Sequence, residues 1–140
     1  MATIFAEPRR PSEHWQLRLK EWVDAVGQFV GEATSWAQKQ GWGTRTDAKT
    51  VTEESLGTYE VPVLLIQTLQ GRVLIDPVAR NIVGAEGRID FCVFPSYDSE
   101  MIIRESGNWR VYDSRRTANS ARDWSEAVFL AATAELLERK

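Results

Sequence analysis

The sequence has few of the residue types on which most protein chemistry depends. Its 140 residues include one histidine, His14, and one cysteine, Cys92. Serine–histidine or cysteine–histidine catalysis would have to use that single histidine. A structural zinc site needs about four cysteine or histidine ligands, so the sequence excludes that class of site. We expect no cofactor.

A single cysteine also rules out an internal disulfide bond, and it is typical of proteins from reducing compartments. No apolar run approaches the roughly 20 residues that span a bilayer, and residues 1–11 lack the basic and apolar regions of a secretory signal. We therefore expect a cytoplasmic protein with no membrane partner. The net charge of −3 disfavours nucleic acid as a partner, because neutralising phosphates needs a basic surface.

Two further absences narrow the possible chemistry. Lysine does not occur between Lys49 and Lys140, which excludes a Schiff-base or lysine general-base centre in that part of the chain. The glycine-rich phosphate loops GxxxxGK[ST] and strand–GxGxxG are also missing. Together with the scarcity of histidine, these absences disfavour an enzyme.

The residues that are present have the composition of one globular domain. Hydrophobic residues make up 43% of the chain and charged residues 26%, and 140 residues can bury one core. Pro8 and Pro11 resist regular structure, so residues 1–11 are predicted to be a flexible N-terminal arm. Residues 12–140 are predicted to form a single α+β domain.

Residues 12–40 carry apolar side chains in steps of three and four, which predicts a long amphipathic helix. Ser12 is its predicted N-cap. Gly27 and Gly31 lie on one side of this helix. They indicate close packing of another element, a kink, or a helix-pair contact in a dimer.

The sequence pattern then changes to alternation, which is typical of β-strands. Residues 42–58 are polar, and we interpret them as a connecting loop that could include a short edge strand. Residues 59–113 predict an antiparallel β-meander of four or five strands, because their short turns cannot join parallel strands. Residues 121–138 predict a C-terminal helix. The predicted fold class is α+β, with both helices packed on one face of the sheet.

The first two predicted strands are apolar on both faces. With Leu65 assigned to the helix-covered face, Leu64, Ile66 and Leu74 should project from the other face. Three aliphatic side chains together are not normally left in water. We expect the N-terminal arm or a second copy of the chain to cover them, and we predict a homodimer with these three residues as its interface.

Asp76, Glu86 and Asp90 lie around the second and third predicted strands. A metal-dependent nuclease core also places acidic residues on adjacent strands, often with a lysine two positions beyond the second acid. Here that position is Cys92, so the signal is weak. We favour a structural role for the three acids in turns and cross-strand ion pairs. A divalent-metal enzyme using them is kept as an alternative, as is a small-ligand-binding domain.

Six tryptophans are a high number for this length. Trp42 and Trp109 lie near predicted loops, and they could form a contact surface with Arg115 and Arg116, because tryptophan and arginine are favoured at interface hot spots. We therefore interpret the chain as a non-enzymatic protein-interaction module, such as a small acidic adaptor, chaperone or immunity-type protein. Its partner would be another protein or a second copy of itself.

Overall fold

The computed structural model describes residues 12–113 and 121–140. Helix α1 (Glu13–Lys39) comes first and helix α2 (Glu126–Leu137) comes last. The strands between them are β1 (Gly43–Glu53), β2 (Gly57–Gln67), β3 (Arg72–Ala79), β4 (Arg88–Val93), β5 (Ser99–Glu105), β6 (Asn108–Tyr112) and β7 (Arg122–Asp123). The predicted N-terminal arm lies outside the described residues.

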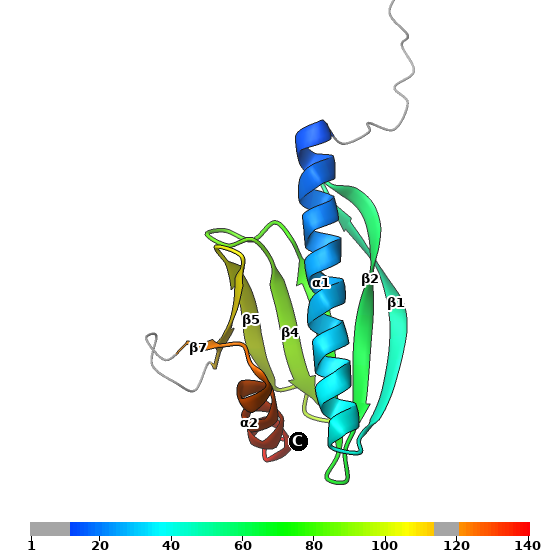
Figure 1. The fold of residues 1–140 in the computed structure, drawn as a ribbon, viewed down its shortest axis with the longest axis vertical. Coiled ribbons are helices and arrows are strands. Elements are labelled where there is room, and N and C mark those ends of the chain that lie inside the picture. Colours follow the sequence, from blue (N-terminus) through cyan, green and yellow to red (C-terminus); the bar gives the residue numbers. More distant parts are fainter. Residues whose placement is uncertain (1–11, 114–120) are drawn as a thin grey trace, which may run out of the picture.

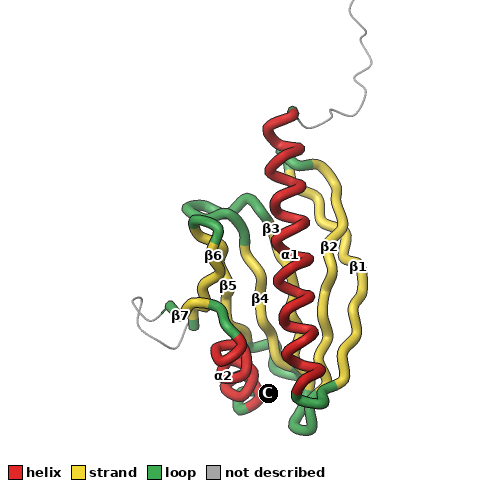
Figure 2. Tube along the Cα trace, in the orientation of Figure 1, coloured by secondary structure: helices red, strands yellow, loops and turns green. Residues whose placement is uncertain are grey.

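The seven strands form one antiparallel sheet in sequence order, from β1 at one edge to β7 at the other. Both helices lie on the same side of this sheet (Figures 1 and 2). Helix α1 contacts β1 and β2, and α2 contacts β3, β4 and β5. The α+β class and the antiparallel meander are confirmed. The predicted number of four or five strands is wrong, because β1 and β7 lie outside residues 59–113, to which the meander was assigned.

Helix α1 matches its predicted span. The Ser12 side chain accepts a hydrogen bond from the backbone N–H of Trp15 and caps the first turn. The helix runs unbroken past Gly27 and Gly31, both of which are exposed, and no atom of the described chain lies within 4 Å of a Cβ built on either. Neither close packing against a described residue nor a break in the helix therefore explains these glycines. No helix in the described part of the chain is long and apolar enough to cross a membrane.

Strand β1 occupies the region that was predicted to be a loop. Only Val51 of its residues is buried, so the strand has no apolar face that alternation could reveal. Threonine nevertheless suits an extended backbone because it is β-branched. The hydroxyls of Thr52 and Thr58 share a hydrogen bond of 2.9 Å across the hairpin. β1 is an edge strand that is held by its pairing with β2 along its whole length.

The C-terminal helix begins at Glu126, later than the predicted start at residue 121. The two residues of β7 pair with β6 instead. Ser125 then caps the helix, because its Oγ accepts a hydrogen bond of 3.2 Å from the backbone N–H of Val128.

Aromatic rings fill much of the core between the helices and the sheet. Phe29 of α1 stacks on Trp124 with ring centroids 4.4 Å apart, and Phe91 of β4 stacks on Phe129 of α2 at 5.9 Å. Because these rings come from separate elements, their packing holds both helices against the sheet. The other rings of this cluster are Trp22, Trp36, Trp42 and Trp109.

The faces of β2 differ from the prediction. Leu64 and Ile66 are fully buried, and they pair with the buried residues Ile75 and Val73 of β3. Leu65, which was assigned to the covered face, is only half-buried. Side chains alternate along a strand, so an assignment that is wrong by one residue exchanges the two faces.

The predicted dimer patch is consequently not a surface. Leu64 and Ile66 lie in the core of a single chain, and Leu74 alone of the three lies on the opposite face. These three residues cannot form one interface. The homodimer itself stays a prediction and needs a different surface.

Candidate functional site

The sheet face opposite the two helices, here called the open face, carries a row of apolar side chains. Leu65, Leu74 and Cys92 are direct cross-strand neighbours on β2, β3 and β4. Directly opposed residues point to the same face, so the three side chains lie side by side. All three are half-buried, and each stands between two fully buried residues of its strand, which face the helices.

An aromatic pair extends this row beyond the end of β4. The rings of Phe94 and Tyr97 lie edge to face, with centroids 5.0 Å apart. The guanidinium of Arg72, at the start of β3, lies over the Phe94 ring at 5.6 Å from its centroid. We call these six residues the open-face patch: Leu65, Arg72, Leu74, Cys92, Phe94 and Tyr97.

Two members of the open-face patch are available to a ligand. Tyr97 has 69% of its surface exposed. Its φ of +62° is uncommon for an aromatic residue, and its N–H donates a hydrogen bond of 2.8 Å to the carbonyl of Val93, which closes the turn. Arg72 forms no ion pair with any residue that the structure describes. An exposed ring in the turn thus lies near an arginine that has no carboxylate partner among residues 12–113 and 121–140.

Cys92 contributes apolar surface rather than reactivity. Burial, with a smaller contribution from the carboxylates of Asp90 and Asp76, raises the pKa of the Cys92 thiol to about 11. The thiolate is the nucleophilic form of cysteine, so this side chain is neutral and unreactive near neutral pH.

The predicted alternative metal site is only partly assembled. Asp76 and Asp90 are direct neighbours across β3 and β4. Each already has a cation: Lys49 Nζ lies 2.7 Å from Asp76 Oδ1, and Arg88 Nε lies 2.8 Å from Asp90 Oδ1. Glu86 does not join them.

Glu86 lies in the β3–β4 loop and is hydrogen-bonded to the β5–β6 turn and the strand before it. Its Oε1 accepts a hydrogen bond of 2.9 Å from the backbone N–H of Gly107, and its own N–H donates to the carbonyl of Arg104. The three acids therefore do not form a common ligand set. The cross-strand ion pair of Asp90 that was favoured over metal binding is instead formed with Arg88 on the same strand.

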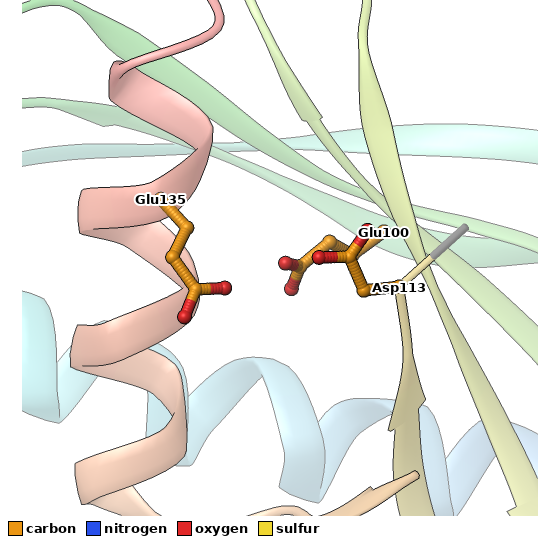
Figure 3. A group of neighbouring side chains, drawn as sticks. All are labelled: Glu100, Asp113 and Glu135. Carbon is orange, nitrogen blue, oxygen red and sulfur yellow. The ribbon is translucent and has the colours of Figure 1, made fainter. Parts of the chain in front are cut away.

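A second cluster of charges lies between α2 and the ends of β5 and β6. Glu100, Asp113 and Glu135 each offer a carboxylate oxygen within 4.8 Å of the others (Figure 3). Figure 3 shows Glu135 reaching from the helix toward the two acids on the sheet. Three carboxylates this close repel one another unless protons or cations compensate them.

Two arginines supply that compensation. Arg122 Nη2 lies 3.1 Å from a Glu135 oxygen and 3.5 Å from a Glu100 oxygen. Arg139 Nη2 lies 3.2 Å from Glu100, and its Nη1 lies 3.8 Å from Asp113. We call this group, which also includes Asp98 at 3.6 Å from Arg139 Nη1, the acid–arginine cluster.

The acid–arginine cluster contains one strongly perturbed acid. Burial, followed by the hydrogen bond to Glu135, raises the pKa of Glu100 to about 7, although Arg122 opposes the shift. Such a pKa suits a general acid or base. Glu100 is fully buried, however, and a catalytic group must reach its substrate. The cluster therefore serves best as an ion-pair network that joins α2 to the sheet.

The predicted contact surface of tryptophans and arginines is not brought together. Trp109 packs on Phe29 with ring centroids 4.9 Å apart, whereas Trp42 packs on Phe129 at 6.2 Å. The two indoles line different clefts, of about 390 and about 530 Å³. Arg115 and Arg116 lie outside the described residues.

Sequence reasoning missed most of this surface and of this network. Alternation from Cys92 places Phe94 on the open face, but no local pattern marks Tyr97 as its exposed partner. Glu100 stands two residues before Ile102 on one strand, so its position on the core side could have been recognised. Nothing in the sequence indicates that Arg139 reaches it.

Comparisons with protein-family models, with curated proteins and with solved structures found no match. Any function of the chain must therefore be inferred from its own geometry.

Proposed function

We propose that the protein is a non-enzymatic protein-interaction module that binds its partner through the open-face patch. One observation carries the proposal: half-buried aliphatic side chains, the exposed ring of Tyr97 and the guanidinium of Arg72, which has no carboxylate partner among the described residues, adjoin on a face that neither helix covers. Aromatic residues and arginine are enriched in protein interfaces, and contiguous exposed apolar surface usually has a partner.

The charges around the open-face patch favour a particular kind of partner. Arg72 lacks a carboxylate among the described residues. Arg45, the direct β1 neighbour of Leu65, is 73% exposed and lies 3.2 Å from the exposed carboxylate of Asp47. Both cations flank the apolar row. A partner segment with aliphatic or aromatic side chains next to aspartate or glutamate would complement them.

The alternative of a carboxylate-dependent enzyme has weaker support. Asp76 and Asp90 are each ion-paired, and Glu86 is held elsewhere. The small-ligand alternative is supported by the cleft of about 530 Å³ that Trp42, Leu130 and Leu137 line with other residues, a size that suits small molecules. Trp42, the aromatic residue in the lining of that cleft, is half-buried, whereas Tyr97 is exposed.

Selection of peptides from a random library on the immobilised protein tests the proposal. We expect enriched sequences in which an acidic residue adjoins aliphatic or aromatic ones. Tyr97→Ser and Arg72→Glu should each weaken the binding of a selected peptide by about tenfold or more, because they remove an anchoring ring or reverse the complementary charge. Circular dichroism would show that both variants are folded.

Val83→Ser is the matched control. Val83 is fully exposed in the β3–β4 loop, outside the open-face patch, so its replacement should leave peptide binding unchanged. The proposal is wrong if the selected peptides show no acidic preference. It is equally wrong if the two patch variants bind them as tightly as the wild type.

A further inference from the structure

The two edges of the sheet differ greatly in length. β7 consists of two residues, which is a common way to keep a sheet edge from pairing with other strands. β1 is eleven residues long, contains no proline, and pairs with β2 without any shift in register. No other described strand pairs with β1, which lies at the outer edge in Figure 1. In such an edge strand every second residue turns its N–H and C=O away from the sheet.

We propose that β1 pairs with β1 of a second copy of the chain. The two strands would run antiparallel about a two-fold axis at Ala48 and join the two sheets into one. This inference concerns a surface other than the open-face patch and does not depend on it. In this register all eleven residues of each strand are paired. The pairs on each side of the axis are Asp47 with Lys49, Thr46 with Thr50, Arg45 with Val51, Thr44 with Thr52, and Gly43 with Glu53.

The side chains of β1 complement themselves in this register. Asp47 of each copy lies opposite Lys49 of the partner subunit, so two pairs of opposite charge form. Threonine pairs opposite threonine on both sides of the axis, as Thr52 already does with Thr58 of β2. Opposite-charge and threonine pairs are both favourable between antiparallel strands.

Neighbouring registers are excluded by charge. The two-fold axis that relates two antiparallel strands is perpendicular to the sheet, so side chains on one face stay on that face. The axis must therefore pass beside a residue and not between two residues. An axis at Asp47 sets Asp47 against itself and Arg45 against Lys49 of the partner subunit. An axis at Lys49 sets that lysine against itself. Among the registers that pair nine or more residues, only the axis at Ala48 avoids like charges.

The alternating signs of these charges also indicate that they do more than prevent the edge strand from pairing with other strands. Charged side chains on an edge often prevent pairing. Arg45, Asp47 and Lys49 alternate in sign on one face of β1, where their direct β2 neighbours are Leu65, Val63 and Val61. Such alternation opposes pairing in the wrong register while favouring one register. The paired sheets would also carry both open-face patches on the same side.

Light scattering after gel filtration of the full chain, over a wide range of concentration, tests the proposal. We expect a dimer for the wild type. Asp47→Lys and Lys49→Asp should each raise the dimer dissociation constant by about tenfold or more, because each creates two like-charge pairs across the axis. An equimolar mixture of the two variants should dimerise again, because each variant then meets the opposite charges on the other.

The controls separate this proposal from the open-face patch and from misfolding. Asp123→Lys changes an exposed acid on the opposite edge and Arg72→Glu changes the patch, and neither should affect the dimer. Lys49 also bonds Asp76 within its own chain, so if Lys49→Asp fails to fold, high salt should restore the dimer of Asp47→Lys by screening the new repulsion. A monomeric wild type, a dimer unaffected by Asp47→Lys, or a folded pair of variants that stays monomeric when mixed would overturn the proposal.

Discussion

The ring of Trp22 lies directly against the backbone of Gly87. A Cβ placed on Gly87 would be 2.1 Å from Cζ3 of Trp22, which is far closer than any real contact, and Gly87 has a φ of +144°. Trp22 is fully buried and also packs on Trp109, with ring centroids 5.8 Å apart. The β3–β4 loop therefore approaches α1 as closely as a glycine allows.

We expect Gly87→Ala to destabilise the protein by about 3 kcal/mol or more, because the methyl group must displace a buried indole and the backbone conformation is unfavourable for alanine. Gly84→Ala is the matched control, since Gly84 has a φ of +77° but no atom within 4 Å of its added Cβ. It should cost only about 1–2 kcal/mol. Urea denaturation measures both. Equal losses for the two variants would mean that Trp22 does not limit the loop.

Glu53 connects the β1–β2 hairpin to the end of β3. Its carboxylate accepts hydrogen bonds from the backbone N–H groups of Arg80 and Asn81, at 3.0 and 2.9 Å, and from the Tyr59 hydroxyl. The Tyr59 hydroxyl in turn accepts a hydrogen bond of 3.2 Å from Trp22 Nε1. Burial and the bond to Glu53 raise the pKa of Tyr59 well above its ordinary value.

Each substitution in this network should affect more than one hydrogen bond, because Glu53, Tyr59 and Trp22 are linked in series. Glu53→Gln is expected to lower the free energy of unfolding by about 1–3 kcal/mol, because one amide oxygen cannot replace a carboxylate as acceptor for three donors. Tyr59→Phe should cost about 1–2 kcal/mol, because it leaves the buried Trp22 N–H without an acceptor. The double variant should lose less than the sum. Glu54→Gln, at the exposed neighbour, should be neutral; strict additivity in denaturation experiments would contradict the coupling.

The raised pKa of Glu100 predicts a pH dependence of stability. An ordinary glutamate in the unfolded chain has a pKa near 4.5, whereas that of folded Glu100 is about 7. The unfolded state therefore loses its proton first as pH rises. The contribution of Glu100 to stability is unimpaired below about pH 4.5, falls as pH rises through about 7, and is constant above that.

Glu100→Gln removes this dependence. The stability of the variant relative to the wild type should increase by up to about 3 kcal/mol between about pH 5 and about pH 8. Chemical denaturation at several pH values measures the difference. For Glu60→Gln, which replaces an exposed glutamate of β2, the free energy of unfolding should change with pH as it does for the wild type. If the free energy of unfolding of Glu100→Gln also changes with pH in parallel with that of the wild type, Glu100 is ionised beside its arginines over the whole pH range.

The elements that sequence patterns predict are those whose burial is regular. Val26, Phe29 and Ala33 recur in helical steps because α1 buries one continuous stripe against the sheet. β1 buries only Val51, so no pattern distinguishes it from a loop. Its pairing with β2 is a tertiary property that becomes visible only when the partner strand is placed.

The error in β2 has a similar origin. The strand buries Tyr59 and Val61 where it pairs only with β1, and Leu64 and Ile66 where it also pairs with β3. An alternation counted from Val61 therefore assigns the second half of the strand to the wrong face. The acid–arginine cluster could not be predicted for another reason, because it joins residues that are far apart along the chain.

The two exposed glycines of α1 give a last prediction. Gly27 and Gly31 lie inside an unbroken helix, and a Cβ on either would meet no atom of the described chain. Gly27→Ala and Gly31→Ala should each stabilise the protein by about 0.5–1 kcal/mol, because alanine has the higher helix propensity and restricts the unfolded chain. Gly41→Ala should act in the opposite direction, since Gly41 ends the helix with a φ of +79°. Thermal denaturation measures all three variants. If the two helix variants instead destabilise the protein, and light scattering shows a change in assembly, the glycines contact a second copy and the dimer interface lies on α1 rather than on β1.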